Sequence, residues 1–228
     1  MNRSGPSLPM PLPLKKSTKR HETATCTSVL RLLSSRSEVK RMRITGGIYR
    51  GRTVACPPGI IRPAMDMMRE SLFSILGNLE GKSWLDLFTG SGCVGIEAAS
   101  RGAAPVHLVE KDRLKKSTII ENISMVESEI TLFMADVHRF IPTAKRQYDI
   151  VYADPPFPMQ GKVGLAQSVD KQKLLSDGGL FIIHYPSEEK GQWPEQVGNL
   201  VCYDQRKYGR STLRFYKNTQ NAGEQHEI

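Results

Sequence analysis

Short apolar runs alternate with amphipathic stretches along the chain between residues 83 and 184. The runs predict buried strands at Ser83–Phe88, Val106–Glu110, Ile130–Met134, Tyr148–Ala153 and Leu180–His184. The stretches between them predict helices from about Val94, over Arg113–Met125, near Val137 and over Val163–Leu175. Strands that alternate with helices form a parallel sheet covered on both faces, so the pattern predicts a doubly wound α/β fold.

Further elements are expected on either side of this alternation. Arg43–Ala55, with glycines between β-prone residues, predicts a small hairpin. Asp66 is expected to cap a helix from Met67 to about Leu79, with a buried stripe of Leu72, Phe73, Ile75 and Leu76. Near the end of the chain, Leu200–Tyr203 and Leu213–Tyr216 predict an antiparallel pair joined around Gly209.

The first 41 residues differ in composition from the rest. They are rich in Pro, Ser, Thr, Lys and Arg, and they hold nine basic residues against two acids, Glu22 and Glu38. We therefore expect residues 1–41 to be a disordered basic extension, with the functional protein beginning near Met42. An artefact of start-codon choice and an organelle transit peptide are alternative interpretations. Residues 42–218 are expected to form one domain, with the hairpin at 42–56, and residues 219–228 a flexible tail.

Composition excludes several classes of protein. No apolar run approaches the roughly 20 residues of a membrane span. The cysteines at 26, 56, 93 and 202 are scattered, so neither a metal site nor a disulfide framework is indicated. A cytoplasmic protein without a membrane partner is the prediction, and nothing in the sequence calls for more than a monomer.

Basic residues gather in two segments at opposite ends of the predicted domain. Residues 42–65 and 205–218 contain no acid. The basic residues that we expect to contact a polyanion are Arg43, Arg50, Arg52, Arg62, Arg206, Lys207 and Arg210. Two solvated faces without a ligand are the alternative.

A glycine-rich turn follows the strand at residues 83–88. Gly90, Gly92 and Gly95 stand at the spacing of a dinucleotide fingerprint, which lets a backbone approach a ligand closely. Glu110, at the end of the next strand, can accept hydrogen bonds from ribose hydroxyls. Asp86, beside the turn, disfavours a pyrophosphate and favours a ligand with a cationic portion. S-adenosylmethionine, with its ammonium and sulfonium groups, is such a ligand.

Carboxylates lie at or near the carboxyl ends of four successive predicted strands, at Asp86, Glu110, Asp136 and Asp154. In a parallel sheet these ends meet at one edge, where ligands bind. Asp136 is expected to reach an adenine amino group, with a helix N-cap as the alternative. His184 ends the fifth strand and is interpreted as a core histidine.

Asp154-Pro155-Pro156-Phe157 forces the chain to leave the sheet, because proline cannot donate to a strand ladder. The Asp154 carboxylate and the Pro155 carbonyl can both accept hydrogen bonds from one amino group. Phe157 can stack on the ring that carries this group. These three residues are the predicted catalytic set.

Four blocks of sequence carry a resemblance to a known family. They are Arg43-Ile44-x-Gly46-Gly47-x-x-Arg50-Gly51, Arg62-Pro63-x-x-Asp66-x-x-Arg69-Glu70-x-Leu72-Phe73, Leu85-Asp86-Leu87-Phe88-x-Gly90-Ser91-Gly92 and Asp154-Pro155-Pro156-Phe157. In this order, between Met42 and about Lys217, they resemble the RsmD-like family of 16S ribosomal RNA (guanine-N2) methyltransferases.

The resemblance implies a class I S-adenosylmethionine-dependent methyltransferase fold of the Rossmann-like kind, with seven mostly parallel strands and the last one antiparallel. It implies S-adenosylmethionine as methyl donor and guanine 966 of 16S ribosomal RNA, free or in the small ribosomal subunit, as acceptor. A DNA adenine-N6 or protein glutamine methyltransferase, which uses a similar turn, is one alternative. A non-catalytic RNA-binding assembly factor is another.

Overall fold

The computed structural model describes residues 41–56 and 64–220. Residues 1–40 of the predicted N-terminal extension, Arg62 and the predicted tail beyond residue 220 lie outside the described residues, whereas Arg41, assigned to the extension, belongs to a strand. The first described element is a hairpin of β1 (Arg41–Arg43) and β2 (Thr53–Ala55), as predicted. It is followed by α2 (Ala64–Leu76).

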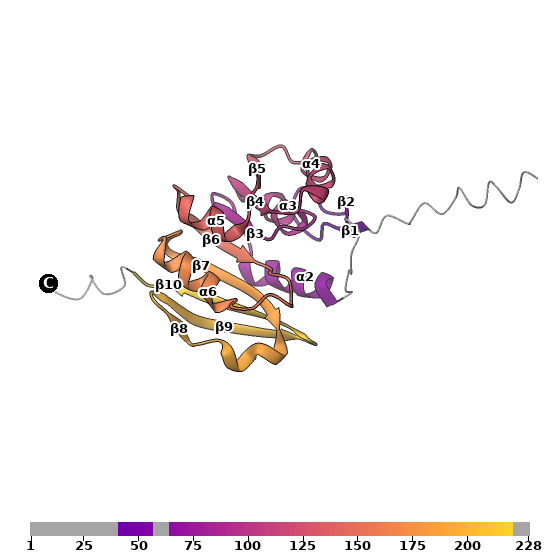
Figure 1. Cartoon of the computed structure of the whole chain (residues 1–228). Helices are drawn as coiled ribbons and strands as arrows, with labels where there is room; N and C mark the ends of the chain where they lie inside the picture. The colour runs from indigo at the N-terminus through magenta and orange to yellow at the C-terminus, as the bar shows by residue number, and fades with distance from the viewer. Residues whose placement is uncertain (1–40, 57–63, 221–228) are drawn as a thin grey trace, which may run out of the picture. The chain divides into compact units, whose positions relative to one another are not determined.

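The main sheet has the strand order β5-β4-β3-β6-β7-β10-β9-β8 and runs from β5 at the top of Figure 1 to β8 at the bottom. Its strands are β3 (Trp84–Leu87), β4 (Val106–Glu110), β5 (Ile130–Met134), β6 (Tyr148–Ala153), β7 (Leu175–Pro186), β8 (Gln196–Val197), β9 (Leu200–Tyr208) and β10 (Ser211–Asn218). β3 to β7 pair in parallel, and β10 inserts antiparallel between β7 and β9. The predicted seven strands and the antiparallel last strand are present, and the two-residue β8 adds an eighth at the edge.

The helices between these strands cover both faces of the sheet. They are α3 (Cys93–Ser100), the 3-10 helix η1 (Arg113–Lys115) with α4 (Lys116–Ile123), α5 (Val137–Phe140) with η2 (Ile141–Thr143), α6 (Val163–Lys171) and η3 (Ser187–Gln192). No helix of the described segments is long and apolar enough to cross a membrane.

Side chains along the central strands alternate between two cores, as the period of two in a strand requires. In β6, Val151 packs into a core with α5 and α6, whereas Ile150 and Tyr152 pack into a core with α2 and α3. All are buried. Because both faces are covered, the central strands read as continuous apolar runs.

Two helix predictions and one strand prediction need correction. α2 begins at Ala64, so Asp66 lies in its first turn, where it pairs with Arg69 at 3.1 Å instead of capping the helix. The buried stripe includes Met68, whereas Ile75 is 38% exposed. α6 ends at Lys171, because Leu175 already belongs to β7 and pairs with Tyr148 of β6; the pairing shifts register over residues 176–179 and resumes at Leu180. Polar residues 176–179 hid this extension in the sequence.

A buried ionic network attaches the hairpin to the domain. The carboxylate of Glu97 in α3 is fully buried and accepts from Arg69 Nε at 2.8 Å, from Arg101 at 3.0 Å and from the Thr45 hydroxyl. Arg69 also donates to the Arg43 carbonyl at 2.7 Å. A Cβ at Gly47 would lie 1.8 Å from the Ser100 carbonyl oxygen, so only glycine allows this close approach. The hairpin is therefore held in one position.

Candidate active site

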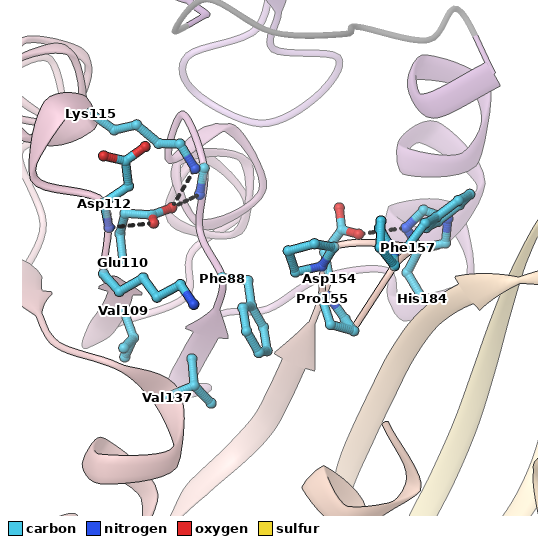
Figure 2. Close-up of a pocket in the computed structure, with 14 residues that line it drawn as sticks. Phe88, Val109, Glu110, Asp112, Lys115, Val137, Asp154, Pro155, Phe157 and His184 are labelled. Carbon is cyan, nitrogen blue, oxygen red and sulfur yellow. Dashed lines mark hydrogen bonds and ion pairs between the residues drawn. The ribbon is translucent and has the colours of Figure 1, made fainter. Parts of the chain in front are cut away.

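A cavity of about 680 Å³ lies at the carboxyl edge of β3, β4, β6 and β7. Its lining includes Gly90 and Glu110 on one side and Asp154, Pro155 and Phe157 on the other. Figure 2 shows Glu110 on one side and Asp154, Pro155 and Phe157 on the other, with Phe88 between them in that view. The structure thus brings the predicted catalytic set together with two of the predicted cofactor residues.

Asp154 follows β6 and is positioned by a neighbouring strand. Its Oδ1 lies 2.6 Å from Nδ1 of His184 in β7, and the ring of Phe157 meets the His184 ring edge-on with centroids 5.3 Å apart. Figure 2 shows the three side chains together. One carboxylate oxygen of Asp154 is therefore oriented by the histidine, while the side chain keeps 23% of its surface exposed.

The interpretation of His184 as a satisfied core histidine is wrong. His184 is buried, but its Nδ1 binds Asp154 and its Nε2 has no hydrogen-bond partner within residues 41–56 and 64–220. The sequence offered one signal, because a histidine at the carboxyl end of a parallel strand lies at the ligand edge.

Glu110 ends β4 and is held by three donors. Its Oε2 accepts from the Gly90 amide and from Lys115 Nζ, each at 3.1 Å, and its Oε1 accepts from the Asp112 amide at 2.9 Å. The residue is 5% exposed and lines the cavity. This arrangement fixes a carboxylate beside the glycine turn.

The glycine turn has the backbone that its sequence predicts. Gly90 and Gly92 have φ of 61° and 81°, in the left-handed region, and Gly92 begins α3. A Cβ at Gly95 would lie 2.3 Å from Leu108 Cδ2, so this glycine permits close helix–strand packing. Phe88 also has a positive φ, 67°, and such strain in an aromatic residue is typical of functional sites.

Asp86 lies behind the turn and does not line the cavity. It is 1% exposed and accepts a 2.8 Å hydrogen bond from the Thr89 hydroxyl. Burial raises the pKa of this carboxyl to about 8, and the nearby carboxylate of Asp154 adds to the shift. Direct contact between Asp86 and a ligand therefore stays a prediction.

Asp136 adopts the alternative role considered for it. Its Oδ1 accepts from the His138 amide at 2.9 Å and caps α5, while its Oδ2 lies 3.8 Å from Lys111 Nζ. The next residue, Val137, lines the cavity. Of the four carboxylates, Asp136 is the one that caps a helix, and its contact with an adenine stays a prediction.

A second, smaller cavity of about 110 Å³ adjoins the first. Phe88, Gly90 and Asp154 line both. Its other walls include Met42 from the hairpin and Arg69 from α2. The hairpin and α2 thus close one end of the site.

The predicted basic residues within the described segments are all exposed, in two groups. Arg43, Arg50 and Arg52 lie on the hairpin, whereas Arg206, Lys207 and Arg210 lie at the β9–β10 turn. This turn is on the same edge of the sheet as the cavity, since Ser211 pairs with Pro186 at the end of β7. Arg52 is also used within the fold, because it lies over the Tyr49 ring and donates to the Met125 carbonyl at 3.3 Å.

Comparison with known proteins agrees with this geometry. Residues 42–217 match the family model described as "Conserved hypothetical protein 95". The chain is 31% identical over 185 residues to the ribosomal RNA small subunit methyltransferase D of Escherichia coli, covering 78% of this chain and 90% of that protein. The chain belongs to the RsmD-like family of ribosomal RNA methyltransferases.

Solved structures support the same fold. The Escherichia coli protein yhhF superposes with a TM-score of 0.70 at 28% identity, covering 79% of this chain and 99% of that one. A Thermus thermophilus 16S rRNA N2 G1207 methyltransferase, in complex with AdoMet and guanosine, has a TM-score of 0.61 at 22% identity. The superposition covers 79% of this chain and 50% of that one. The predicted S-adenosylmethionine-dependent methyltransferase fold is confirmed.

Proposed function

We propose that this protein transfers a methyl group from S-adenosylmethionine to the N2 amine of a guanine in 16S ribosomal RNA, with guanine 966 as the expected nucleotide. The observation that supports this best is the cavity in which Asp154, Pro155 and Phe157 face Gly90 and Glu110. The Asp154–Phe157 turn, which suits an amino-bearing ring, thus lies across the cavity from the glycine turn and Glu110, which suit a nucleoside.

The residues of the site fit S-adenosylmethionine. Val109 and Val137 offer apolar walls for an adenine, and Glu110 offers oxygens to ribose hydroxyls. Gly90 lines both cavities. Because glycine has no side chain, a ligand that extends from one cavity into the other could pass close to the backbone there. In the smaller cavity, Arg69 and the Ser91 hydroxyl suit the amino-acid portion. When bound, the cofactor supplies an electrophilic methyl group.

The Asp154–Phe157 turn would hold the target base. Oδ1 of Asp154 is occupied by His184 at 2.6 Å, so the other oxygen is the one to accept an N2–H hydrogen bond. The Pro155 carbonyl would accept the second N2–H, and Phe157 would stack on the ring, a contact worth roughly 1–3 kcal/mol. Two acceptors around one nitrogen favour its pyramidal geometry and stabilise the positive charge that develops there. Asp154 can then take the proton that this nitrogen loses.

The basic residues would bind phosphates on either side of the site. Phosphate contacts supply affinity and position, whereas the base pocket selects the nucleotide. The hairpin and the β9–β10 turn both expose arginines, and the buried Glu97 network keeps the hairpin in place. A monomeric state and a cytoplasmic location remain predictions.

The test is a transfer assay with labelled methyl donor. The protein is offered 16S rRNA, assembled small subunits, DNA and protein in parallel, and labelled RNA is digested to nucleosides. We expect N2-methylguanosine from rRNA or subunits, located at guanine 966 by mass spectrometry of fragments. Label in N6-methyladenosine or in protein would establish one of the alternative methyltransferase classes, and absence of label everywhere would favour the assembly factor.

A further inference from the structure

Lys162 is a charged residue buried directly after the Asp154–Phe157 turn, at the start of α6. It is 4% exposed. Its ammonium donates to the Phe157 carbonyl at 2.8 Å and to the Met159 carbonyl at 2.6 Å. It also lies 2.7 and 3.0 Å from the two carboxylate oxygens of Glu189 in η3. The three N–H groups of an ammonium are fully used by these acceptors.

The turn needs donors from outside because its own backbone has few. Pro155, Pro156 and Pro158 lack an N–H. The Met159 amide donates to the Pro156 carbonyl within the turn at 2.9 Å, and the Asp154 amide donates to the Leu87 carbonyl of β3 at 3.3 Å. Carbonyls shielded from water require partners, and Lys162 donates to those of Phe157 and Met159 in this partly buried turn.

Stability alone does not explain a charged residue here. Removing an ammonium from water is costly, and an apolar residue of similar volume often stabilises a fold as well as a buried ion pair does. Within the described residues, the hydrogen bonds of the Lys162 ammonium go to the turn and to Glu189. Glu189 in η3 compensates the charge of Lys162. The turn is therefore connected to η3 as well as to α6, which follows it in the chain.

We propose that Lys162, with Glu189 as its counter-ion, is a positioning residue that fixes the backbone of residues 154–159 and so sets where Phe157 and Asp154 meet the target base. The expected effect of Lys162 on catalysis rests on the proposed function, whereas its expected effect on the backbone of the turn does not. η3 also carries Glu188, which pairs with Arg210 at 2.9 Å. The ion pair therefore anchors the base-binding turn to an element that contacts the basic β9–β10 turn.

The first measurement is hydrogen exchange, which needs no substrate. Lys162→Met should raise the exchange rate of the amides of Phe157, Met159, Gln160 and Gly161, because it removes both carbonyl bonds, and leave the glycine turn at 89–92 unchanged. Lys171→Met, at the exposed end of α6, is the matched control. Unchanged exchange in residues 157–161 of Lys162→Met overturns the proposal.

The second measurement is steady-state methylation of unmethylated small-subunit rRNA. Lys162→Met should lower kcat roughly 10- to 100-fold, the scale expected for a misplaced reacting group. Its Tm should fall, because two carbonyls and Glu189 lose their partner, but its dissociation constant for S-adenosylmethionine should stay at the wild-type value. A general loss of structure would instead weaken cofactor binding together with kcat. Lys162→Arg, which keeps the charge but not the geometry at both carbonyls, should retain intermediate activity.

Glu189→Gln keeps the fold testable if Lys162→Met does not fold. It should raise exchange in the same residues by less, and the double variant should be no worse than Lys162→Met, because both act through one contact. Wild-type exchange in Glu189→Gln contradicts the role of Glu189, and faster exchange in the double variant than in Lys162→Met contradicts their action through one contact. Failure of the wild-type protein to methylate guanine contradicts the proposed function instead, and the exchange result then still decides whether Lys162 fixes the turn.

Discussion

The two sides of the large cavity are built in different ways. On the glycine-turn side, Gly90 and Glu110 are held mainly by neighbours in sequence or by backbone amides, such as the Asp112 amide on Glu110. On the Asp154–Phe157 side, the carboxylate and the turn are held by side chains from elsewhere, His184 in β7 and the Lys162–Glu189 pair. The contacts of Glu110 with Gly90 and Asp112 span 20 and 2 residues, whereas those of Asp154 with His184 and of Lys162 with Glu189 span 30 and 27. The proposed base-binding side therefore depends more on residues distant in sequence than the proposed cofactor side does.

The largest expected effect separates the two sides. Asp154→Ala should lower kcat on the order of 1,000-fold, since it removes an acceptor that acts on developing charge, and should leave S-adenosylmethionine affinity near that of wild type. Calorimetric titration with the cofactor and a methylation assay on the same preparation measure both. Equal losses of binding and turnover would show that the two sides are not independent.

Asp86 tests the electrostatic cost behind the glycine turn. Its pKa is about 8 in the fold against an ordinary 3.8, so the folded protein holds this proton between these pH values while the unfolded chain has lost it. The contribution to stability is full below pH 4 and is lost as pH rises towards 8, and over this range it amounts to several kcal/mol. Asp86→Asn should therefore be more stable than wild type at pH 8, and its free energy of unfolding should vary less with pH. Urea denaturation at a series of pH values measures this, and parallel pH curves for the two proteins would contradict it.

His184 tests whether the base side depends on a distant residue. His184→Phe fills the space but removes the donor to Asp154, and we expect kcat to fall roughly 30-fold with cofactor binding unchanged. His184→Asn, which places an amide N–H near the position of Nδ1, should recover part of the loss. If both variants have the same kcat, the hydrogen bond to Asp154 has no role in positioning.

Glu110 is the converse test on the cofactor side. Glu110→Gln weakens the acceptors offered to ribose hydroxyls and should raise the dissociation constant of S-adenosylmethionine about 10-fold, with little change in kcat at saturation. Inhibition by S-adenosylhomocysteine should weaken in parallel. A reduced kcat at saturating cofactor would place Glu110 on the reacting side instead.

The smallest effect is expected on the hairpin, which lies outside the two sides of the large cavity. Arg50→Ala should raise the KM for rRNA about 3-fold and reduce the slope of log affinity against log salt by about 0.7–0.9, as loss of one phosphate contact does. Arg52→Ala should in addition lower Tm, because Arg52 contacts the Tyr49 ring and the Met125 carbonyl. An unchanged salt slope in Arg50→Ala would remove the hairpin from the RNA-binding surface.

Much of the fold and half of the site could be predicted because the signals are local. β4, β5 and β6 begin and end where their apolar runs do. Prediction failed where tertiary contacts override the pattern, as in β7, which begins at Leu175 because this residue pairs with Tyr148 of β6 ahead of the irregular residues 176–179. Ile75 was assigned to the core by spacing alone, but it is 38% exposed among the described residues.

The sequence by itself determined the order of strands and helices, the glycine turn, the edge at which the carboxylates gather and the family. These depend on side-chain period, backbone freedom and proline, which act over a few residues. Only the tertiary structure decided that Asp86 lies behind the turn, that His184 contacts Asp154 and that Lys162 pairs with Glu189. Such contacts join residues distant in sequence, and no local pattern records which side chain will reach which partner.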